Sequence, residues 1–423
     1  MRITIVTWGS YGDVFPYISL ALGLKRAGHE VRLATNIGFE ELVEEYGLES
    51  LPMDWNIREY FEGLEMIFNF PPLDMIFLGT KQLHNGFLAE LWRVCQQSEA
   101  IIFNSSAYPC YYIAEKLGIP CYAAPLQPYH QTRAFPHPFV FNGKPLGNIY
   151  NWFSYSLFDQ VFWQFIRRPI NQWRQKTLNL PPLLSGKGVM HQMQHQKLPF
   201  LYAYSPASLP KPSEWPESVD VTGYWFLDSP SNWQPPQDLV DFLADGSAPV
   251  YVGFSNKGIG EPEALTKLVL EALKISGQRG ILLIGEDFID NGNLPDYVFP
   301  IEWIPFDWLF PKTAAVVHHG GCGTVHTALR AGVPNIIIPE DYDNVFWGYR
   351  IAELGVAPLP IPKNKLSVKR LAAAIETAVS DQNMQTRVAA LSKKVQAENG
   401  VQRAVEVFHK YLPSQLLSQA SRN

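Results

Sequence analysis

The chain has 423 residues, of which 47% are hydrophobic and 17% are charged, and its formal net charge is −6. This length predicts two or three domains, and this composition is typical of a soluble globular protein with sizeable cores. The small net charge and the lack of a continuous basic block argue against nucleic acid as a partner. The four cysteines form no CxxC pair and have no histidine at metal-binding spacing, so we expect free thiols in a reducing compartment.

The first residues, MRITIVTWGS, lead directly into an apolar strand pattern. Their apolar run is too short for a signal peptide and no small-residue cleavage site follows it. No stretch of the chain reaches the roughly 18 apolar residues of a membrane-spanning helix. We therefore expect a cytoplasmic protein.

Strands and helices alternate in the first half of the chain. The predicted strands are residues 2–8, 30–35, 100–105 and 119–125, and the predicted helices are 15–28, 37–47 and 109–118. The strands are apolar without alternation and are linked by helices. This pattern predicts a parallel sheet that is covered on both faces.

The second half repeats the pattern. Its predicted strands are 249–255, 280–285, 314–320 and 334–338, with helices at 264–277 and from Gly323 onward. Between the halves, LDSPSNWQPPQ (227–237) is rich in Pro, Ser and Asn, as a linker should be. Two such α/β units facing each other would leave a cleft at the carboxyl ends of their strands, where ligands of these sheets bind.

An unusual turn follows the predicted strand 314–320. In VVHHGGCGT (316–324), two histidines precede three glycines at the start of a helix. A helix N-terminus carries unpaired N–H groups and partial positive charge, so an anion is the expected occupant, with His319 and Thr324 as further donors. The sequence matches neither a Walker loop nor GxGxxG. A tight glycine turn with two surface histidines is the alternative interpretation.

Residues 303–356 resemble the donor-sugar signature of the UDP-glycosyltransferase superfamily, nearest to its sterol and antibiotic glycosyltransferase branch. The resemblance depends on the motifs IEWIPFDWLFPKT, HHGGCGT, LRAGVP and PEDYDNVFWG, and extends to 9–31 and 170–183. It implies the GT-B fold, in which two doubly wound Rossmann-like domains face each other across a cleft. We expect an N-terminal acceptor domain at 1–226, a linker at 227–240, a C-terminal nucleotide-sugar domain at 241–400, and a final helix in 401–423 that packs back on the N-terminal domain.

The resemblance implies a role for each residue of a donor site. Trp303 would stack on the nucleobase, and the backbone of Ile304 would read its edge. His319 would donate to a diphosphate oxygen, and Asp343 and Asn344 would hold hydroxyls of the transferred sugar. The residues expected to cradle the phosphates are Gly321, Gly323 and Thr324.

Three positions depart from the pattern of the superfamily. Asn344 stands where glutamine is usual and is one methylene shorter. Thr327 stands where plant members have a ribose-binding glutamate, which leaves the nucleotide, UDP or TDP, open. GFSN (253–256) is one residue shorter than the usual GFGSM turn, and Ser255 is the candidate phosphate contact there.

The sequence DYD (341–343) also fits a DxD metal site, since two carboxylates can hold Mg²⁺ or Mn²⁺ against a diphosphate. DxD is common by chance. In the superfamily the helix terminus and the residue equivalent to His319 replace the metal. We therefore expect no metal and no cofactor other than the nucleotide-sugar co-substrate.

Asp13 is the candidate catalytic base. It follows the first strand in GDVFP (12–16), at the predicted cleft edge, with Pro16 expected in the first turn of the next helix. The superfamily has its base here, as histidine or aspartate, and the base takes the proton of the acceptor hydroxyl while the anomeric centre inverts. Helix capping is the alternative role for Asp13.

Three other histidines have structural roles in this interpretation. His29 lies at a helix-to-strand turn away from the cleft, His318 packs or supports the site, and His326 is an ordinary helix residue.

The segment 150–173 is dense in aromatic residues, and several of them fall at helical spacing. These are Tyr155, Phe158, Phe162 and Phe165. They fit an aromatic core stripe, an apolar acceptor pocket, or a face that rests on a membrane. A second apolar stretch, 66–79, is expected over the same cleft. The candidate acceptor residues are Phe158, Phe162 and Phe68.

The function predicted is an inverting, metal-independent glycosyltransferase that moves a sugar, with glucose as the first expectation, to a hydroxyl of a sterol, lipid, polyketide or phenol. Its partners would be a nucleotide sugar, a hydrophobic small molecule and a membrane surface. Two alternatives are a sugar-nucleotide epimerase, which needs no aromatic pocket, and a catalytically silent sugar-nucleotide-binding protein, which would be expected to lose Asp13 or His319.

Overall fold

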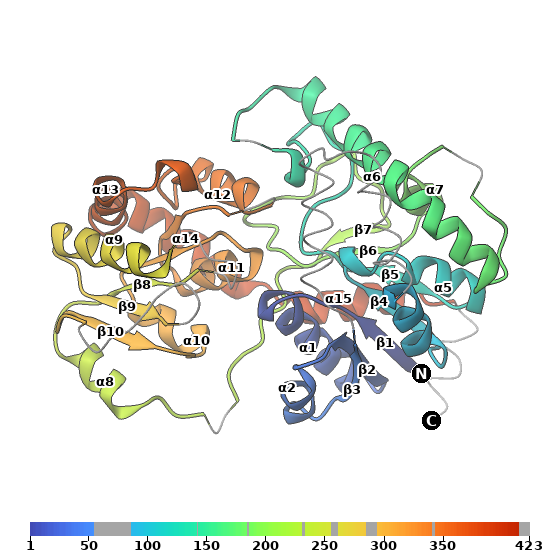
Figure 1. Ribbon diagram of the computed structural model, residues 1–423, viewed down its shortest axis with the longest axis horizontal. Helices are drawn as coiled ribbons and strands as arrows, with labels where there is room; N and C mark the ends of the chain where they lie inside the picture. Colours follow the sequence, from blue (N-terminus) through green and yellow to red (C-terminus); the bar gives the residue numbers. More distant parts are fainter. Residues whose placement is uncertain are drawn as a thin grey trace.

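The computed structural model of the protein describes residues 1–54, 86–141, 143–183, 186–230, 233–254, 261–284, 294–340 and 343–413. Two parallel β-sheets lie side by side, each with helices packed against it (Figure 1). This arrangement confirms the two doubly wound α/β units predicted from the sequence.

The first sheet has the strand order β3-β2-β1-β4-β5-β6-β7, and all of its pairs are parallel. Its strands are β1 (Arg2–Val6), β2 (Glu30–Asn36), β3 (Glu49–Met53), β4 (Ala100–Phe103), β5 (Cys121–Ala123), β6 (Phe200–Tyr202) and β7 (Val219–Val221). The two central strands, β1 and β4, are buried almost throughout, because helices cover both faces. β3, β6 and β7 were not predicted from the sequence.

The second sheet has the order β10-β9-β8-β11-β12 and is also parallel throughout. Its strands are β8 (Val250–Val252), β9 (Gly280–Leu283), β10 (Val298–Ile301), β11 (Ala315–His318) and β12 (Asn335–Ile337). Side chains of β8 alternate between two cores: Val250 and Val252 belong to one hydrophobic cluster and Tyr251 to another.

The helices of the first half are α1 (Tyr11–Arg26), α2 (Glu40–Glu45), α5 (Cys110–Leu117), α6 (Asn148–Lys176) and α7 (Val189–His195). Those of the second half are α8 (Gln237–Ala244), α9 (Pro262–Ile275), α10 (Phe306–Leu309), α11 (Cys322–Ala331), α12 (Asp343–Glu353), α13 (Val368–Ser380), α14 (Gln382–Ala397) and α15 (Gly400–Lys410). The core of the first half also includes Val325 and Trp347, from α11 and α12, so the halves share a packed contact. No helix in the described ranges is long and apolar enough to span a membrane.

Helix α1 begins at Tyr11, four residues before the predicted start. Ser10 and Asp13 form a capping box, which starts the helix early. Asp13 therefore lies in the first helical turn and not in the turn before the helix, so the predicted start at residue 15 is wrong. Pro16 lies one turn further inside the helix than predicted.

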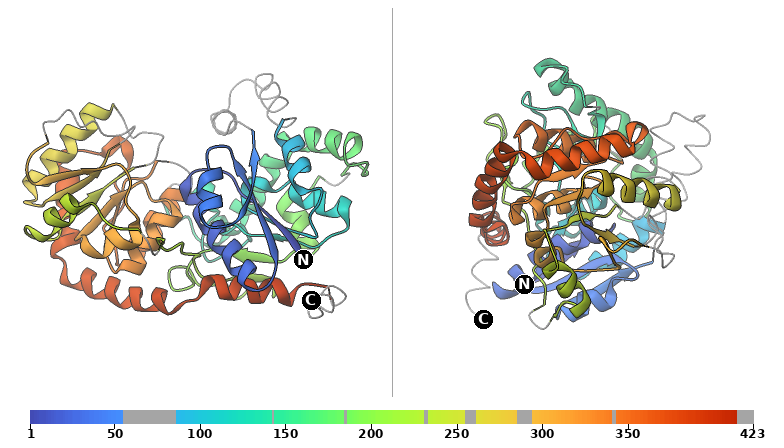
Figure 2. Two further views of the ribbon diagram at one scale, coloured as in Figure 1. Left: turned by 90° about the horizontal axis from the view of Figure 1, so that it is seen from below. Right: turned by 90° about the vertical axis from the view of Figure 1, so that its left-hand side faces the viewer.

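Helix α14 packs on the second half, and the last described helix, α15, packs on the first. Figure 2 shows α14 and α15 running in succession beneath both halves. A side chain at Gly23 of α1 would collide with Val401, so glycine permits the close contact between α1 and α15. The Tyr122 hydroxyl donates to the Phe408 carbonyl at 2.9 Å.

His29 also joins α15 to the first half. The imidazole is buried, and its Nε2 lies 2.8 Å from Nε2 of His409. The structural role predicted for His29 is confirmed.

Candidate active site

The loops that follow β1 and β11 meet at the contact between the halves. Each strand lies next to the point where the strand order of its sheet reverses, which is where ligands of such sheets bind. A Cβ added to Gly323 would lie 2.7 Å from the Tyr224 hydroxyl oxygen and 4.0 Å from Cα of Gly12. The first turns of α1 and α11 are therefore neighbours, and both helix N-termini add partial positive charge there.

The turn between β11 and α11 needs its glycines. Gly320 has a φ of +100°, and a Cβ there would lie 2.8 Å from Ile337 Cγ2 and 3.1 Å from the Asn344 carbonyl oxygen. A Cβ at Gly321 would lie 2.5 Å from Nε2 of His319. Gly321 is also the N-cap residue, and it has no side chain to occupy the first amide groups of α11.

His318 holds this turn from below. Its ring is buried, with Nε2 2.8 Å from Asn335 Oδ1, while Nδ1 accepts the Gly320 N–H at 3.1 Å. Because Asn335 Oδ1 can only accept, the proton must be on Nε2. Burial, followed by the charge of His319, lowers the pKa of His318 to about 3. The packing and supporting role predicted for His318 is confirmed.

The predicted base-binding and phosphate-binding side chains lie at the carboxyl ends of neighbouring strands. Trp303 follows β10 and its side chain is 51% exposed, whereas Ile304 is buried beside it. His319 and Thr324 are partly exposed at the two ends of the glycine turn. An exposed indole and a partly open helix N-terminus suit a nucleobase and a phosphate, and these roles stay predictions.

Asp13 caps helix α1, which is the role given above as the alternative to catalysis. Its Oδ2 accepts the Ser10 backbone N–H at 2.9 Å and the Ser10 hydroxyl at 3.0 Å. A side chain at Gly9 would collide with this carboxylate, and Gly9 has a φ of +145°. The loop therefore fixes the carboxylate beside the α1–α11 contact. Capping does not prevent proton transfer, so the catalytic role of Asp13 stays a prediction.

Asp343 is the first residue of α12, and a side chain from the other half reaches it. Gln127, in the loop after β5, donates from Nε2 to Asp343 Oδ2 at 3.0 Å. The neighbouring Asn344 packs against Gly320. Gln127 was not predicted from the sequence, although its position after a strand of a parallel sheet placed it at the ligand-binding edge.

Helix α11, which begins at Cys322, contacts both α1 and α12, the helices that carry the two predicted carboxylates. Burial raises the pKa of the Cys322 thiol, and the charges of Asp343 and Asp13 raise that pKa further. The Cys322 Sγ donates to the Leu126 carbonyl at 3.4 Å. Asp13 and Asp343 are 330 residues apart in the sequence, but the helices that carry them both contact α11.

His326 is not the ordinary helix residue that the sequence suggested. It is fully buried between the halves, with Nδ1 2.7 Å from the Cys322 carbonyl and Nε2 3.0 Å from the Ser208 hydroxyl. Its ring stacks on Tyr224 with centroids 5.2 Å apart. Burial lowers its pKa to about 4. The prediction failed because α11 packs against both halves and has no solvent face at this position.

Phe158 and Phe162, which are both partly exposed, form an aromatic stack in the first half. Their centroids are 6.1 Å apart, Phe158 also stacks on His137 at 4.1 Å, and Phe162 meets the edge of Tyr108 at 5.6 Å. These contacts match the core-stripe interpretation, and the acceptor role of both rings stays a prediction.

Several predicted residues, Phe68, Ser255 and Asp341 of the DYD sequence, lie outside the described residues. Among the residues that are described, no group of three His, Cys, Asp or Glu side chains is arranged to hold a metal ion.

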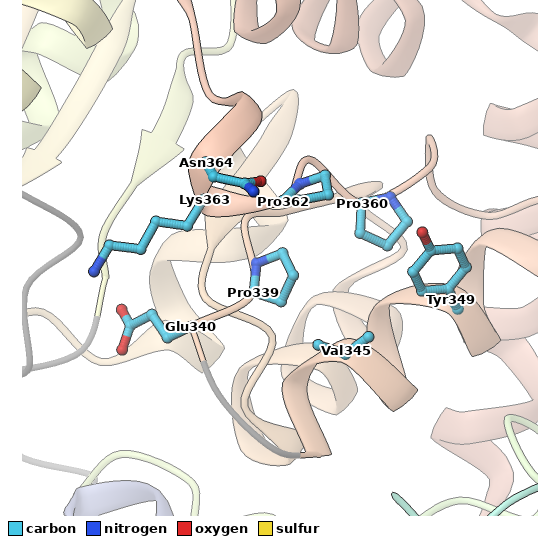
Figure 3. A pocket seen from close by; sticks show the side chains of 8 residues that line it. All are labelled: Pro339, Glu340, Val345, Tyr349, Pro360, Pro362, Lys363 and Asn364. Carbon is cyan, nitrogen blue, oxygen red and sulfur yellow. The ribbon is translucent and has the colours of Figure 1, made fainter. Parts of the chain in front are cut away.

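A cavity of about 580 Å³ lies against α12, and its lining includes Val345, the residue after the predicted sugar-binding pair. Val345 and Tyr349 of α12 form one side and three prolines face them (Figure 3). Its lining residues are Pro339, Glu340, Val345, Tyr349, Pro360, Pro362, Lys363 and Asn364. None of the predicted donor residues lines the cavity.

Known protein families match most of the chain. Residues 3–136 match the family model described as the glycosyltransferase family 28 N-terminal domain. Residues 281–409 match the one described as the C-terminal domain of erythromycin biosynthesis protein CIII-like proteins. A solved structure, the glycotransferase of kitacinnamycin, covers 97% of this chain and 99% of its own with a TM-score of 0.73 and 20% identity, a likeness of fold.

Two curated relatives are similar in sequence as well. The sterol 3-beta-glucosyltransferase UGT80B1 of Arabidopsis thaliana is 37% identical over 98% of this chain and 69% of its own length. A sterol 3-beta-glucosyltransferase of Sclerotinia sclerotiorum is 37% identical over 97% of this chain. The chain spans only 29% of that fungal relative.

Proposed function

Because this chain belongs to the UDP-glycosyltransferase superfamily, in the branch of the sterol 3-beta-glucosyltransferases and the antibiotic glycosyltransferases, we propose that it moves a sugar from a nucleoside diphosphate sugar to a hydroxyl of a hydrophobic small molecule. The convergence of Asp13, the glycine turn and Asp343 at the contact of the halves carries this proposal. A sterol is the first acceptor and glucose the first sugar to test, as the names of the curated relatives suggest.

On the donor side, Trp303 would stack on uracil or thymine and the diphosphate would lie against the glycine turn. His319 and the first amide groups of α11 would stabilise the charge that grows on the leaving diphosphate. These donors would replace a metal ion, so the proposed reaction is metal-independent. Excess EDTA should leave its rate unchanged. Asp343 and Asn344 would bind the sugar hydroxyls.

On the acceptor side, Asp13 would take the proton as the acceptor hydroxyl attacks the anomeric carbon opposite the leaving group. The anomeric centre would then invert. An ordinary aspartate has a pKa of about 3.9, so it is a weak base toward an alcohol, and proton transfer would come late in the step. The contact with Ser10 would orient the carboxylate. We place the encounter with the hydrophobic acceptor at a membrane surface.

The test is incubation with UDP- and TDP-sugars and a panel of sterol and phenolic acceptors. Free nucleoside diphosphate together with an acceptor heavier by one hexose is the expected result, with an inverted anomeric centre by NMR. Conversion of one nucleotide sugar into its epimer without acceptor would support an epimerase. Tight binding of the nucleotide sugar without any product, on the whole panel, would support a silent binding protein.

A further inference from the structure

One side of α6 exposes an apolar stripe. Its side chains are four residues apart, so they lie on one helical face and span about 18 Å. They are Ile149 (69% exposed), Phe153 (63%), Leu157 (62%) and Val161 (38%), and Leu146 (54%) lies just before the helix. In Figure 1, the first turns of α6 form the upper margin of the molecule. The other exposed large hydrophobic residues in the described ranges do not form such a series.

The opposite side of α6 attaches the helix to the protein. Tyr155, Trp163 and Ile166 are buried there. Asp159 is buried too, and its carboxylate accepts the N–H groups of Met190 and His191 at the start of α7. The stripe therefore contributes little to the packing of α6, and polar substitutions in it should leave the fold intact.

Basic residues continue the stripe. Arg167 is five helical turns after Ile149 and so lies on the same face, and Arg168 lies close to the line of Leu157. Both are exposed. The C-terminal part of this face is therefore cationic where the N-terminal part is apolar.

The surrounding segment is also positively charged. Residues 143–197 contain seven Lys or Arg and one acidic residue, Asp159, a surplus of six positive charges in a chain whose net charge is −6. Arg174 is buried against Glu115 at 2.6 Å, and Asp159 is buried. The exposed charges of the segment are therefore all positive. They are Lys144, Arg167, Arg168, Lys176, Lys187 and Lys197.

We propose that this face of α6 docks on the surface of a membrane that contains anionic phospholipids. Apolar side chains would enter the boundary between headgroups and acyl chains, and the cations would bind the anionic headgroups. A second copy of the chain fits less well, because it would bring the same exposed cations against each other. The proposal deepens the proposed function, since Phe158 and Phe162 lie on this helix and a hydrophobic acceptor resides in lipid.

The test measures co-sedimentation of the full chain with phosphatidylcholine vesicles that contain or lack phosphatidylserine, with no sugar nucleotide present. We expect binding only with phosphatidylserine, and weaker binding at high salt. The pair Phe153→Ser and Leu157→Ser should weaken it by about tenfold or more, and so should Arg167→Glu with Arg168→Glu. The matched control is Ile275→Ser with Leu359→Ser, at exposed positions of the second half that should not matter.

Circular dichroism and the midpoint of thermal unfolding should be unchanged in all variants. The proposal is overturned if the wild-type chain binds vesicles with and without phosphatidylserine equally, or binds neither. It is also overturned if the control pair loses as much binding as the stripe pair. It is also overturned if the stripe pair converts a dimer into a monomer without changing vesicle binding. The assay does not depend on sugar transfer. Its result would therefore still test membrane docking if the chain proved not to be a glycosyltransferase.

Discussion

The loop after β1 and the turn after β11 have the same place in their sheets but differ in the residues at the start of the helix that follows. Each ends a buried parallel strand and starts a helix, and the two helices meet at their first turns. In the first loop, the Asp13 carboxylate occupies its own helix terminus. In the second, the N-cap residue Gly321 has no side chain to accept from the first amide groups of α11. The residue at the cap therefore decides whether the same strand-to-helix connection carries a candidate base or a candidate anion site.

The largest effect should come from Asp13→Asn. Asparagine keeps an oxygen that can accept the Ser10 N–H, so the cap should survive while the base is lost. We expect transfer to fall by about 10² to 10⁴-fold, with unchanged affinity for UDP. Steady-state rates and calorimetric titration with UDP would measure this. The matched control is Ser10→Ala, which keeps the carboxylate and should cost about 1 kcal/mol of stability or less. More than a tenth of wild-type turnover in Asp13→Asn at every pH would exclude Asp13 as the base.

The corresponding substitution in the glycine turn after β11 is His319→Ala. It removes a donor to the diphosphate, so the affinity for UDP should fall by about 1–3 kcal/mol, the usual worth of a hydrogen bond to a charged group. Binding of uridine should change little, since Trp303 would hold that end. Titration calorimetry with both ligands gives the comparison. Equal losses for uridine and UDP would instead assign the histidine to the fold.

The resemblance to the superfamily and the apolar strands predicted both strand-to-helix connections, and most of their site residues, from the sequence alone. The glycine turn could be recognised because glycines, histidines and a helix start are local features. The early start of α1 was missed because the capping box of Ser10 and Asp13 outweighs the two glycines around it. The contact of Gln127 with Asp343 could not be predicted, since it depends on how two distant halves meet. His326 was misjudged for the same reason.

The buried His318, which holds the glycine turn, should make the free energy of unfolding depend on pH in the acid range. Above pH 6.5, His318 is neutral in the folded and the unfolded chain. Between pH 6.5 and about 3 only the unfolded chain binds the proton, so this histidine lowers the free energy of unfolding by up to about 1.4 kcal/mol per pH unit as the pH falls. His318→Gln should remove that part of the slope in urea unfolding between pH 7 and 5. Equal slopes in the wild type and the variant would contradict the buried neutral ring.

A smaller effect is expected at the link between the halves. Gln127→Ala removes a donor to Asp343, so the KM for the sugar nucleotide should rise by up to about tenfold. The affinity for UDP, which lacks the transferred sugar, should stay the same. Gln127→Glu places a second carboxylate beside Asp343 and should lose more activity at pH 8 than at pH 5. If UDP and UDP-sugar lose affinity equally, Gln127 only holds the halves together.

The smallest change in the best rate should come from Asn344→Gln, which restores the length usual in the superfamily. Asparagine is one methylene shorter than glutamine, so in the proposed site one sugar hydroxyl would be bridged by water. A site that binds a hydroxyl directly rejects sugars in which it is missing or inverted, because its own polar group is then left unpaired. The variant should therefore change the ranking of donors more than the rate with the best donor. Competition among UDP-glucose, UDP-galactose, UDP-N-acetylglucosamine and UDP-xylose measures it, with Asp343→Ala as the inactive control. An unchanged ranking would remove Asn344 from donor selection, and full activity in Asp343→Ala would move the sugar away from the start of α12.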